Sequence, residues 1–210
     1  MSEKIKHITH WDEAEKKKRT EGDISGTWTL LGEAAESVAV GMRRIEVDPG
    51  MRSTALHVHG AEEEIFYVLG GSGLLFLGEP TDGKTCEVRP GDCIVHPADG
   101  DAHVLRAGKE GLDVLTYGTR VNVELCRLPR ANMAWAGPTV LVAPGIQNLW
   151  KADVAAGPFE FPAPGPRFPN VIARSLLAGT CWLLAVPRYR RIIALRRQRS
   201  RRRSKGPFMS

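Results

Sequence analysis

Short apolar runs separated by turn residues dominate the chain between residues 26 and 126. The runs are rich in Val, Ile, Leu, Thr and aromatic residues, and Gly, Pro and Asp interrupt them at close, regular intervals, a pattern that favours strands over helices. Many short strands at such spacing are typical of a sandwich or a barrel, so the sequence predicts an all-β fold. The expected strands cover residues 26–31, 37–47, 53–59, 64–69, 73–78, 84–88, 92–96, 102–107 and 112–126.

Three turn sequences connect these strands. GGSG at residues 70–73 is expected to join the flanking runs as a hairpin, and PTDGK at 80–84 and PADGD at 97–101 predict two further reversals. No GxGxxG or GxxxxGKS/T motif lies between a strand and a helix, so the sequence gives no support to a nucleotide-binding α/β fold.

Composition divides the chain into segments around an expected barrel at residues 26–126. Residues 1–25 are expected to form an arm with a short helix over residues 9–19, because Thr9 is a candidate cap and good helix formers follow it. Residues 127–173 are rich in Pro, Gly and aromatic residues and predict a wrap over the barrel or a dimer arm. The expected anchors of this wrap are Trp135, Trp150, Phe159 and Phe161.

The net charge of +5 hides an asymmetry between the barrel and residues 174–210. This tail contains eleven Arg and Lys residues and no acid, so the preceding residues carry an excess of acid. Its apolar beginning is too short to span a bilayer, which needs about 20 residues. Contact with an anionic membrane, contact with nucleic acid, and no selected role are the alternatives for the tail. The N-terminus shows no apolar secretion signal and the cysteines form no close pair, so we expect a cytoplasmic protein.

Candidate metal ligands lie in the segment PGMRSTALHVHGAEEEIFYVLGG, residues 49–71. His57 and His59 are two positions apart, so on a strand both rings leave the same face, with Cα atoms about 7 Å apart. Glu64 begins the next expected strand after a turn at Gly60, which can bring its carboxylate beside the two rings. A metal ion would compensate this carboxylate inside a barrel, where an unpaired charge is costly.

A second segment, RPGDCIVHPADGDAHVLRAG at residues 89–108, adds His103 on a neighbouring strand. Three imidazoles and one carboxylate then face one point, a set that suits one divalent transition metal (Fe, Mn, Ni, Zn or Co) rather than Ca or Mg. His96 lies two positions after Ile94, which is expected to face inward. It is a candidate to replace His103 as a ligand or to move a proton beside the metal, whereas its place before Pro97 favours a structural role at the strand end.

The two segments resemble the two motifs of the cupin superfamily, in the form typical of small microbial cupins with a single barrel. Residues 50–71 are similar to the first motif, Gly-x(5)-His-x-His-x(3,4)-Glu-x(6)-Gly. Residues 91–103 are similar to the second, Gly-x(5)-Pro-x-Gly-x(2)-His-x(3)-Asn. Each segment contains one extra residue, and Ala107 stands where the second motif has Asn, but no metal ligand is lost.

The resemblance implies a cupin-type jelly-roll β-barrel with a metal held by His57, His59, Glu64 and His103. Together with the expected sheet edges and the aromatic wrap, it favours a homodimer that binds a small-molecule ligand or substrate. The leading expectation is a metal-dependent enzyme with dioxygenase or related oxidoreductase chemistry. The alternatives are a Lewis-acid isomerase or lyase, in which His96 is the candidate catalytic residue, and a non-catalytic protein that binds or senses a small ligand.

Overall fold

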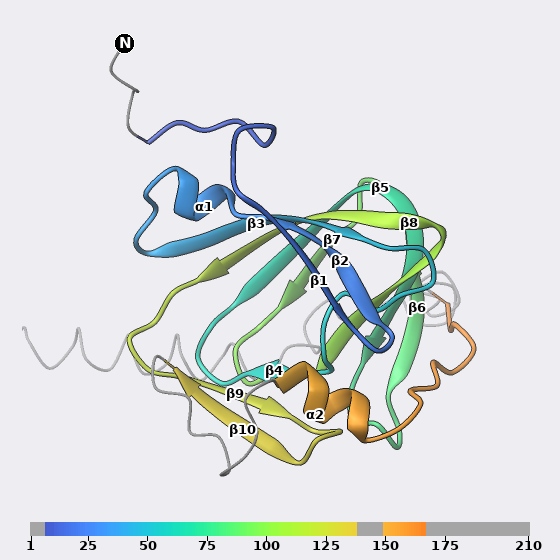
Figure 1. Ribbon diagram of the computed structural model, residues 1–210. Helices are drawn as coiled ribbons and strands as arrows, with labels where there is room; N and C mark the ends of the chain where they lie inside the picture. Colours follow the sequence, from blue (N-terminus) through green and yellow to red (C-terminus); the bar gives the residue numbers. More distant parts are fainter. Residues whose placement is uncertain (1–6, 138–148, 167–210) are drawn as a thin grey trace, which may run out of the picture. The chain divides into compact units, whose positions relative to one another are not determined.

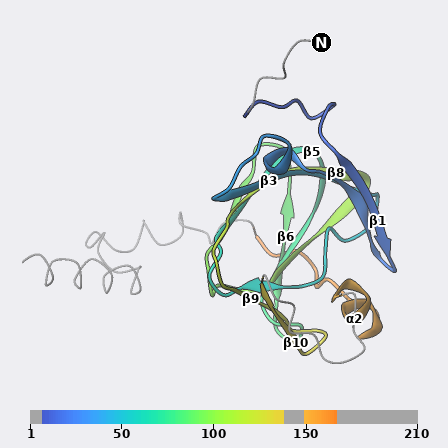
Figure 2. The same cartoon turned by 60° about the vertical axis from the view of Figure 1, so that its left-hand side comes forward.

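Two antiparallel sheets enclose the core in the computed structural model, which describes residues 7–137 and 149–166. The larger sheet curls until its inner face looks toward the smaller one, as Figures 1 and 2 show, and this is the predicted all-β jelly roll. In the larger sheet the strand order is β1 (Lys16–Glu21), β2 (Ile24–Thr29), β3 (Val40–Val47), β8 (His103–Thr119), β5 (Glu64–Leu77) and β6 (Lys84–Val88), and β7 (Cys93–His96) pairs with β5. The smaller sheet has the order β10 (Met133–Gly137), β9 (Glu124–Leu128) and β4 (Val58–His59), and the helices are α1 (Leu31–Ala34) and α2 (Leu149–Ala155).

The core lies on the inner face of the larger sheet. Val68 of β5 and Leu105 and Val114 of β8 are fully buried, and Ile45 and Val47 of β3 pack into the same cluster. Burying one Val or Leu side chain stabilises a fold by roughly 1.5–3 kcal/mol, so this face supplies much of the stability that holds the sheet in its curled shape.

The GGSG segment is not a hairpin, which corrects the prediction for residues 70–73. β5 runs through it without reversing and stays paired with β8, with register shifts between Val68 and Gly70 and between Gly71 and Gly73. Gly71 has φ +73°, and a Cβ there would stand 2.3 Å from a backbone oxygen of β8. The glycines therefore provide a bulge and a close approach of two backbones. As a result β5 replaces the expected strands 64–69 and 73–78, and β8 joins 102–107 to the first part of 112–126, whose last residues belong to β9.

The helix expected over residues 9–19 is also absent. Residues 11–13 form a turn, and β1 pairs with β2 from Lys16 opposite Thr29 to Glu21 opposite Ile24. Helix propensity is a weak local preference, and the ladder to an established strand of the sheet outweighs it. A short helix does occur near the N-terminus, but it is α1, which follows β2.

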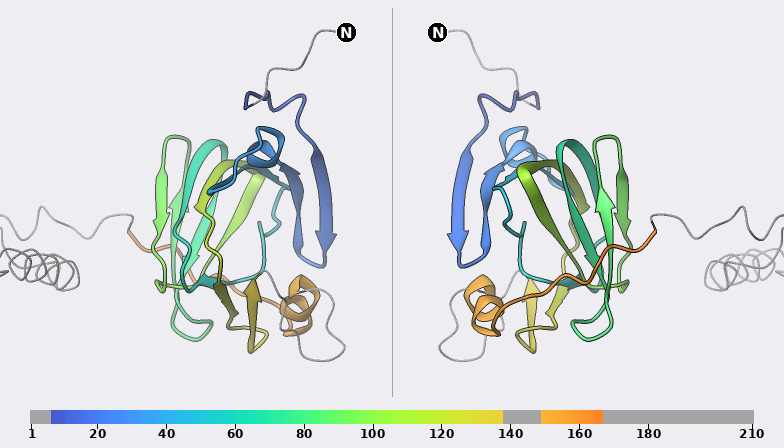
Figure 3. Two further views of the ribbon diagram at one scale, coloured as in Figure 1. Left: turned by 90° about the vertical axis from the view of Figure 1, so that its left-hand side faces the viewer. Right: turned by 90° about the vertical axis from the view of Figure 1, so that its right-hand side faces the viewer.

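Residues 149–166, here called the C-terminal strap, lie against the rolled sheet, and Figure 3 shows them crossing its outside. The ring of Trp150 lies 5.1 Å from that of Trp28, and the ring of Phe159 lies 4.9 Å from that of Phe76. These two aromatic residues of the strap therefore pack against aromatic side chains of the larger sheet. In residues 7–137 and 149–166, no helix is long and apolar enough to cross a bilayer, and the basic tail at 174–210 falls outside the described residues.

Candidate metal centre

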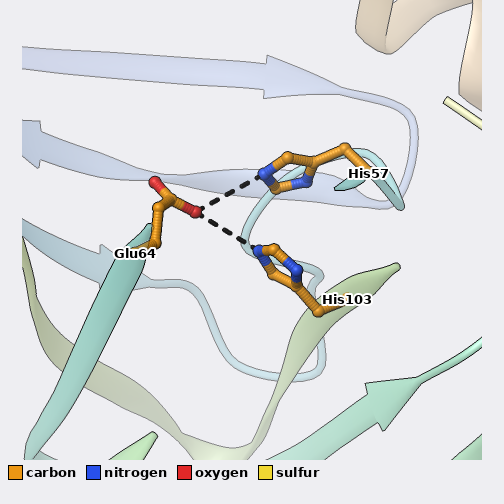
Figure 4. Close-up of side chains that lie close together, drawn as sticks. All are labelled: His57, Glu64 and His103. Carbon is orange, nitrogen blue, oxygen red and sulfur yellow. Dashed lines mark hydrogen bonds and ion pairs between the residues drawn. The ribbon is translucent and has the colours of Figure 1, made fainter. Parts of the chain in front are cut away.

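Three imidazole rings point at one carboxylate inside the rolled sheet. Nε2 of His103 lies 3.3 Å, Nε2 of His59 lies 3.4 Å and Nε2 of His57 lies 3.7 Å from Oε2 of Glu64. Figure 4 shows His57 and His103 directed at the same oxygen of Glu64. The structure thus gathers the four expected metal ligands around Oε2 of Glu64. The donor atoms of His57, Glu64 and His103 all lie within 4.8 Å of one another, whereas His59 forms such a group with Glu62 and Glu124.

Strand pairing places these side chains. Glu64 begins β5, His59 ends β4, and His103 begins β8. His57 pairs with His103 through two backbone hydrogen bonds, which are 2.8 Å from N of His103 to O of His57 and 3.3 Å in the opposite sense. The rings of His57 and His59 have centroids 5.0 Å apart, as expected for two residues on one side of an extended segment.

The second nitrogen of each ring fixes its orientation. Nδ1 of His57 and Nδ1 of His103 face the carbonyl oxygen two residues earlier in the chain, at 2.9 and 3.4 Å. Nδ1 of His59 lies 3.3 Å from Oε1 of Glu124. Carbonyl and carboxylate oxygens accept hydrogen bonds, so we assign the ring hydrogen to Nδ1 in all three, which directs the Nε2 lone pairs at Glu64.

Glu124, the first residue of β9, is a residue of the site that sequence analysis missed. It is only 2% exposed, and besides facing His59 its carboxylate accepts three backbone hydrogen bonds. The donors are the N–H groups of Gly60 at 2.8 Å, Ala61 at 3.0 Å and Glu62 at 2.9 Å. One buried carboxylate therefore holds both a ring of the site and the loop that connects β4 to β5.

The burial pattern of β9 explains why the sequence concealed Glu124. Val123 and Leu125, the apolar neighbours of Glu124, are 74% and 55% exposed. Hydrophobic alternation would bury these two residues and expose Glu124, which is the reverse of what the structure shows. Only the tertiary contact with His59 identifies the carboxylate as part of the site.

The donor set fits a divalent metal ion. Three Nε2 lone pairs and one carboxylate oxygen are all electron-pair donors, and with the ring hydrogens on Nδ1 no hydrogen lies between them. Such a cluster repels itself unless a cation or an extra proton occupies its centre. Donor atoms about 2.1 Å from one ion stand about 3 Å apart when the bonds meet at right angles, which is close to the 3.3–3.7 Å between the three Nε2 atoms and Oε2 of Glu64.

The pKa values of these groups reflect burial and mutual charge. Burial favours the neutral form of Glu64, yet the surrounding rings of His103, His57 and His59, which donate to its carboxylate whenever they carry a second proton, hold its pKa well below the usual value. Burial also opposes the charged form of His59, but the carboxylates of Glu64 and Glu124 raise its pKa. In His103, burial and the charge of His57 outweigh Glu64 and lower the pKa to about 4.

His96 lies beside the cluster rather than among its converging donors. Its ring stacks on His103 with centroids 3.6 Å apart, and it is directly opposite Glu64 in the β5–β7 pairing. Burial and the charge of His103 lower its pKa to about 2, so the ring is neutral near pH 7. Its Nε2 atom is buried and has no hydrogen-bond partner among the described residues.

Comparisons with known proteins agree with this fold. The family model described as "Cupin domain" matches residues 43–116. A protein from Acidithiobacillus ferrooxidans with the provisional designation sugar phosphate isomerase is 30% identical, with a TM-score of 0.50, over 54% of this chain and 71% of that one. No curated protein is similar enough to count as a match.

Two further solved structures share the architecture. A sugar phosphate isomerase of the cupin superfamily from Silicibacter pomeroyi is 22% identical, with a TM-score of 0.54, over 61% of this chain and 85% of that one. The polyketide cyclase RemF from Streptomyces resistomycificus is 27% identical, with a TM-score of 0.44, over 57% of this chain and 79% of that one. At 22% identity, the structure from Silicibacter pomeroyi shows a shared fold.

Proposed function

The chain belongs to the cupin superfamily, and from this premise we propose that it is a metal-dependent enzyme that acts on a small molecule. The observation that supports the proposal is the convergence of His57, His59 and His103 on Oε2 of Glu64, with every Nδ1 atom engaged elsewhere. In this proposal the three imidazoles are neutral ligands and Glu64 offsets part of the charge of the ion.

When bound, a divalent ion supplies either Lewis acidity toward a carbonyl group or a redox centre for oxygen chemistry. The protein contributes position and surroundings. Phe66 is 5% exposed and packs edge-on against His103 and His96, so it restricts water on that side of the site. Glu64 is 21% exposed and His57 is 13% exposed, so a small molecule can reach the opposite side.

Two reaction classes fit this arrangement. Isomerisation gains support from the 30% identical protein designated a sugar phosphate isomerase. Dioxygenase or related oxidoreductase chemistry rests on the ligand set alone. The proton-moving role of His96 stays a prediction, and its lowered pKa favours a neutral hydrogen-bonding group over a base. A non-catalytic, ligand-binding protein would hold the same metal without turnover.

Metal content tests the proposal directly. Elemental analysis of protein purified without oxygen should find about one transition-metal ion per chain. The double variant His57→Ala, His59→Ala should lose it, whereas His7→Ala, His10→Ala, which removes two exposed histidines outside the site, should retain it. Equal metal content in all three proteins would reject the ligand assignment.

The identity of the metal and the consumption of oxygen separate the reaction classes. Iron together with substrate-dependent oxygen uptake supports oxygenase chemistry. Turnover without oxygen uptake supports isomerisation or lyase chemistry. A metal-loaded protein that binds small molecules but converts none supports the non-catalytic alternative.

We also propose that the protein forms a homodimer through the outer face of β7, β5 and β8. Val95, Ile65 and Tyr117 are direct cross-strand neighbours, and Tyr67 follows on the same face. Val95, Tyr67 and Tyr117 are 49%, 44% and 42% exposed, and a two-fold partner would cover this apolar row with an identical one. Light scattering should give twice the chain mass, and Tyr117→Glu should give the single mass; a monomeric unsubstituted protein would contradict the proposal.

A further inference from the structure

At the end of the larger sheet where β5 begins, two arginines contact the same carboxylate oxygen. Nη2 of Arg120 lies 2.8 Å and Nη2 of Arg43 lies 3.2 Å from Oε1 of Glu33, a residue of α1. The side chains of Arg120, Arg43 and Glu33 are 36%, 47% and 35% exposed, so a solute can reach them. Two guanidinium groups against one carboxylate leave an excess of one positive charge.

Strand register places this pair on the same side of the sheet as the candidate metal ligands. Glu64 of β5 is opposite Gly118 of β8, and Gly118 is opposite Gly41 of β3, so the three residues form one row. Direct cross-strand neighbours share a face, and Glu64 points into the rolled sheet toward the three histidines. The inner face of this row thus carries a glutamate followed by two glycines.

Each glycine lies beneath one of the charged side chains. A Cβ atom on Gly118 would stand 3.4 Å from Cγ and 3.8 Å from Oε1 of Glu64. A Cβ atom on Gly41 would stand 3.4 Å from Nε and 3.6 Å from Nη2 of Arg120. Neighbouring strands are about 4.8 Å apart. The guanidinium of Arg120, over β3, is therefore displaced by one strand from Oε1 of Glu64, over β8, which is the carboxylate oxygen that does not face the histidines.

Donor groups remain for a ligand at this position. Among the described residues, the hydrogen bonds of Arg43 and Arg120 reach Glu33 through Nη2 alone, which leaves Nε and Nη1 of both side chains without a protein acceptor. Nη2 has two hydrogens and uses one for Glu33, so on each guanidinium one edge remains, made by the other Nη2 hydrogen together with Nε or Nη1. Such a two-donor edge matches the oxygens of a carboxylate or a phosphate.

We propose that Arg120, assisted by Arg43, forms an anion subsite next to the metal centre, where it binds the carboxylate or phosphate group of a small anionic substrate. The proposal rests on the metal-dependent function proposed above and adds the substrate class. The anionic group lies over Gly41 and Gly118, and the rest of the molecule extends toward Oε1 of Glu64. A side chain at either glycine would stand in van der Waals contact with the guanidinium or with Glu64 and take up part of this space.

Calorimetric titration of the metal-loaded protein with inorganic phosphate and, separately, with glycolate tests the proposal. The unsubstituted protein should bind at least one of the two probes, and preference for one distinguishes a phosphate from a carboxylate substrate. Arg120→Gln should weaken that binding about tenfold or more, because it removes a charge-assisted hydrogen-bond donor. Arg120→Lys, which keeps the charge but loses the planar fork, should restore part of it.

Arg44, which follows Arg43 in β3, offers a matched control. Arg44 faces the opposite side of the sheet, where it pairs with Asp113, so Arg44→Gln removes the same charge without touching the subsite and should change probe binding less than twofold. Glu33→Gln should tighten binding, because it frees both arginines from their competing carboxylate. This gain cannot come from a variant that fails to fold.

Metal content, measured for each variant, separates the two proposals. If the unsubstituted protein retains its metal but Arg120→Gln binds the probe as tightly, or if Arg44→Gln weakens binding equally, the subsite is rejected and the metal centre stands. If the metal-loaded protein binds neither probe, the subsite is likewise rejected. If the unsubstituted protein binds no metal, the proposed function fails, and the subsite fails with it.

Discussion

At the scale of single residues, the site depends on which nitrogen of each histidine carries the hydrogen. The rings of His57 and His103 are oriented by carbonyl oxygens of their own segments, whereas the ring of His59 is oriented by Glu124, 65 positions away in the chain. The first two contacts follow from local backbone geometry. The third requires β9 to lie beside β4, so no local pattern predicts it.

Glu124→Gln should weaken metal binding. The amide has one acceptor oxygen instead of two and no charge, so it cannot hold both the ring of His59 and the loop before β5 as the carboxylate does. We expect a dissociation constant about 10- to 100-fold higher, measured by competition with a chromophoric chelator. As a control, Asp153→Asn removes another buried carboxylate, one far from these rings in sequence, and should leave the metal affinity unchanged. If Glu124→Gln also left the metal affinity unaltered, Glu124 would have no role in positioning His59.

At the scale of elements, the C-terminal strap shows how a segment with little regular structure is fixed to the sheet. Oδ2 of Asp153 accepts hydrogen bonds from Arg52 at 2.7 Å and from Arg130 at 2.8 Å. Asp153 is fully buried and Arg52 is 1% exposed, and Arg52 also makes a bidentate pair with Asp23. The aromatic residues of the strap predicted that it would pack on the barrel, but its ion pairs could not be assigned before the partners were placed.

Asp153→Asn should destabilise the fold, because it leaves two guanidinium groups at a buried position with one carboxylate fewer. Breaking a buried ion pair from one side costs about 3 kcal/mol. Urea unfolding should therefore show a lower midpoint with a similar slope. Asp113→Asn, which breaks the more exposed pair with Arg44, is the control and should cost less than about 1 kcal/mol. Equal midpoints for Asp153→Asn and the unsubstituted protein would mean that the strap contributes little.

The long strands show the limit of element prediction. Turn residues at GGSG predicted a reversal, yet in β5 the same residues bend a continuous strand and allow β8 to approach closely. Glycine permits both outcomes, and the ladder between β5 and β8 selects one of them. No strand ladder continues across the turns at 80–84 and 97–101 in the described part of the chain. These turns do reverse the chain between the strands that they were expected to connect.

At the scale of the whole molecule, the buried histidines connect the site to the stability of the fold. His96 has a pKa near 2 and His103 a pKa near 4, against about 6.5 in an unfolded chain. As pH falls below 6.5, the unfolded state binds protons that the folded state does not, so the free energy of unfolding decreases. His59, with its raised pKa, acts in the opposite sense, and its contribution is complete below 6.5.

The metal-free protein should therefore lose stability steadily between pH 6.5 and pH 4. Each uncompensated proton contributes about 1.4 kcal/mol per pH unit to the slope. His96→Leu, of similar size and without a titrating ring, should reduce the slope by about one proton. Urea unfolding in the presence of a chelator at several pH values measures this, and an unchanged slope would show that His96 is accessible to protons in the folded state.

The sequence by itself determined the period-two alternation and the three histidines that surround Oε2 of Glu64, because the side on which a strand residue points is a local property. The jelly-roll class was implied by the resemblance of its two motifs to those of cupins. Only the tertiary structure decided which strands lie side by side. That pairing joins β5 to β8 along their whole length, brings Glu124 to His59, and places Arg120 one strand from Glu64. These contacts connect residues far apart in the chain, and their energies come from burial and pairing that no single segment contains.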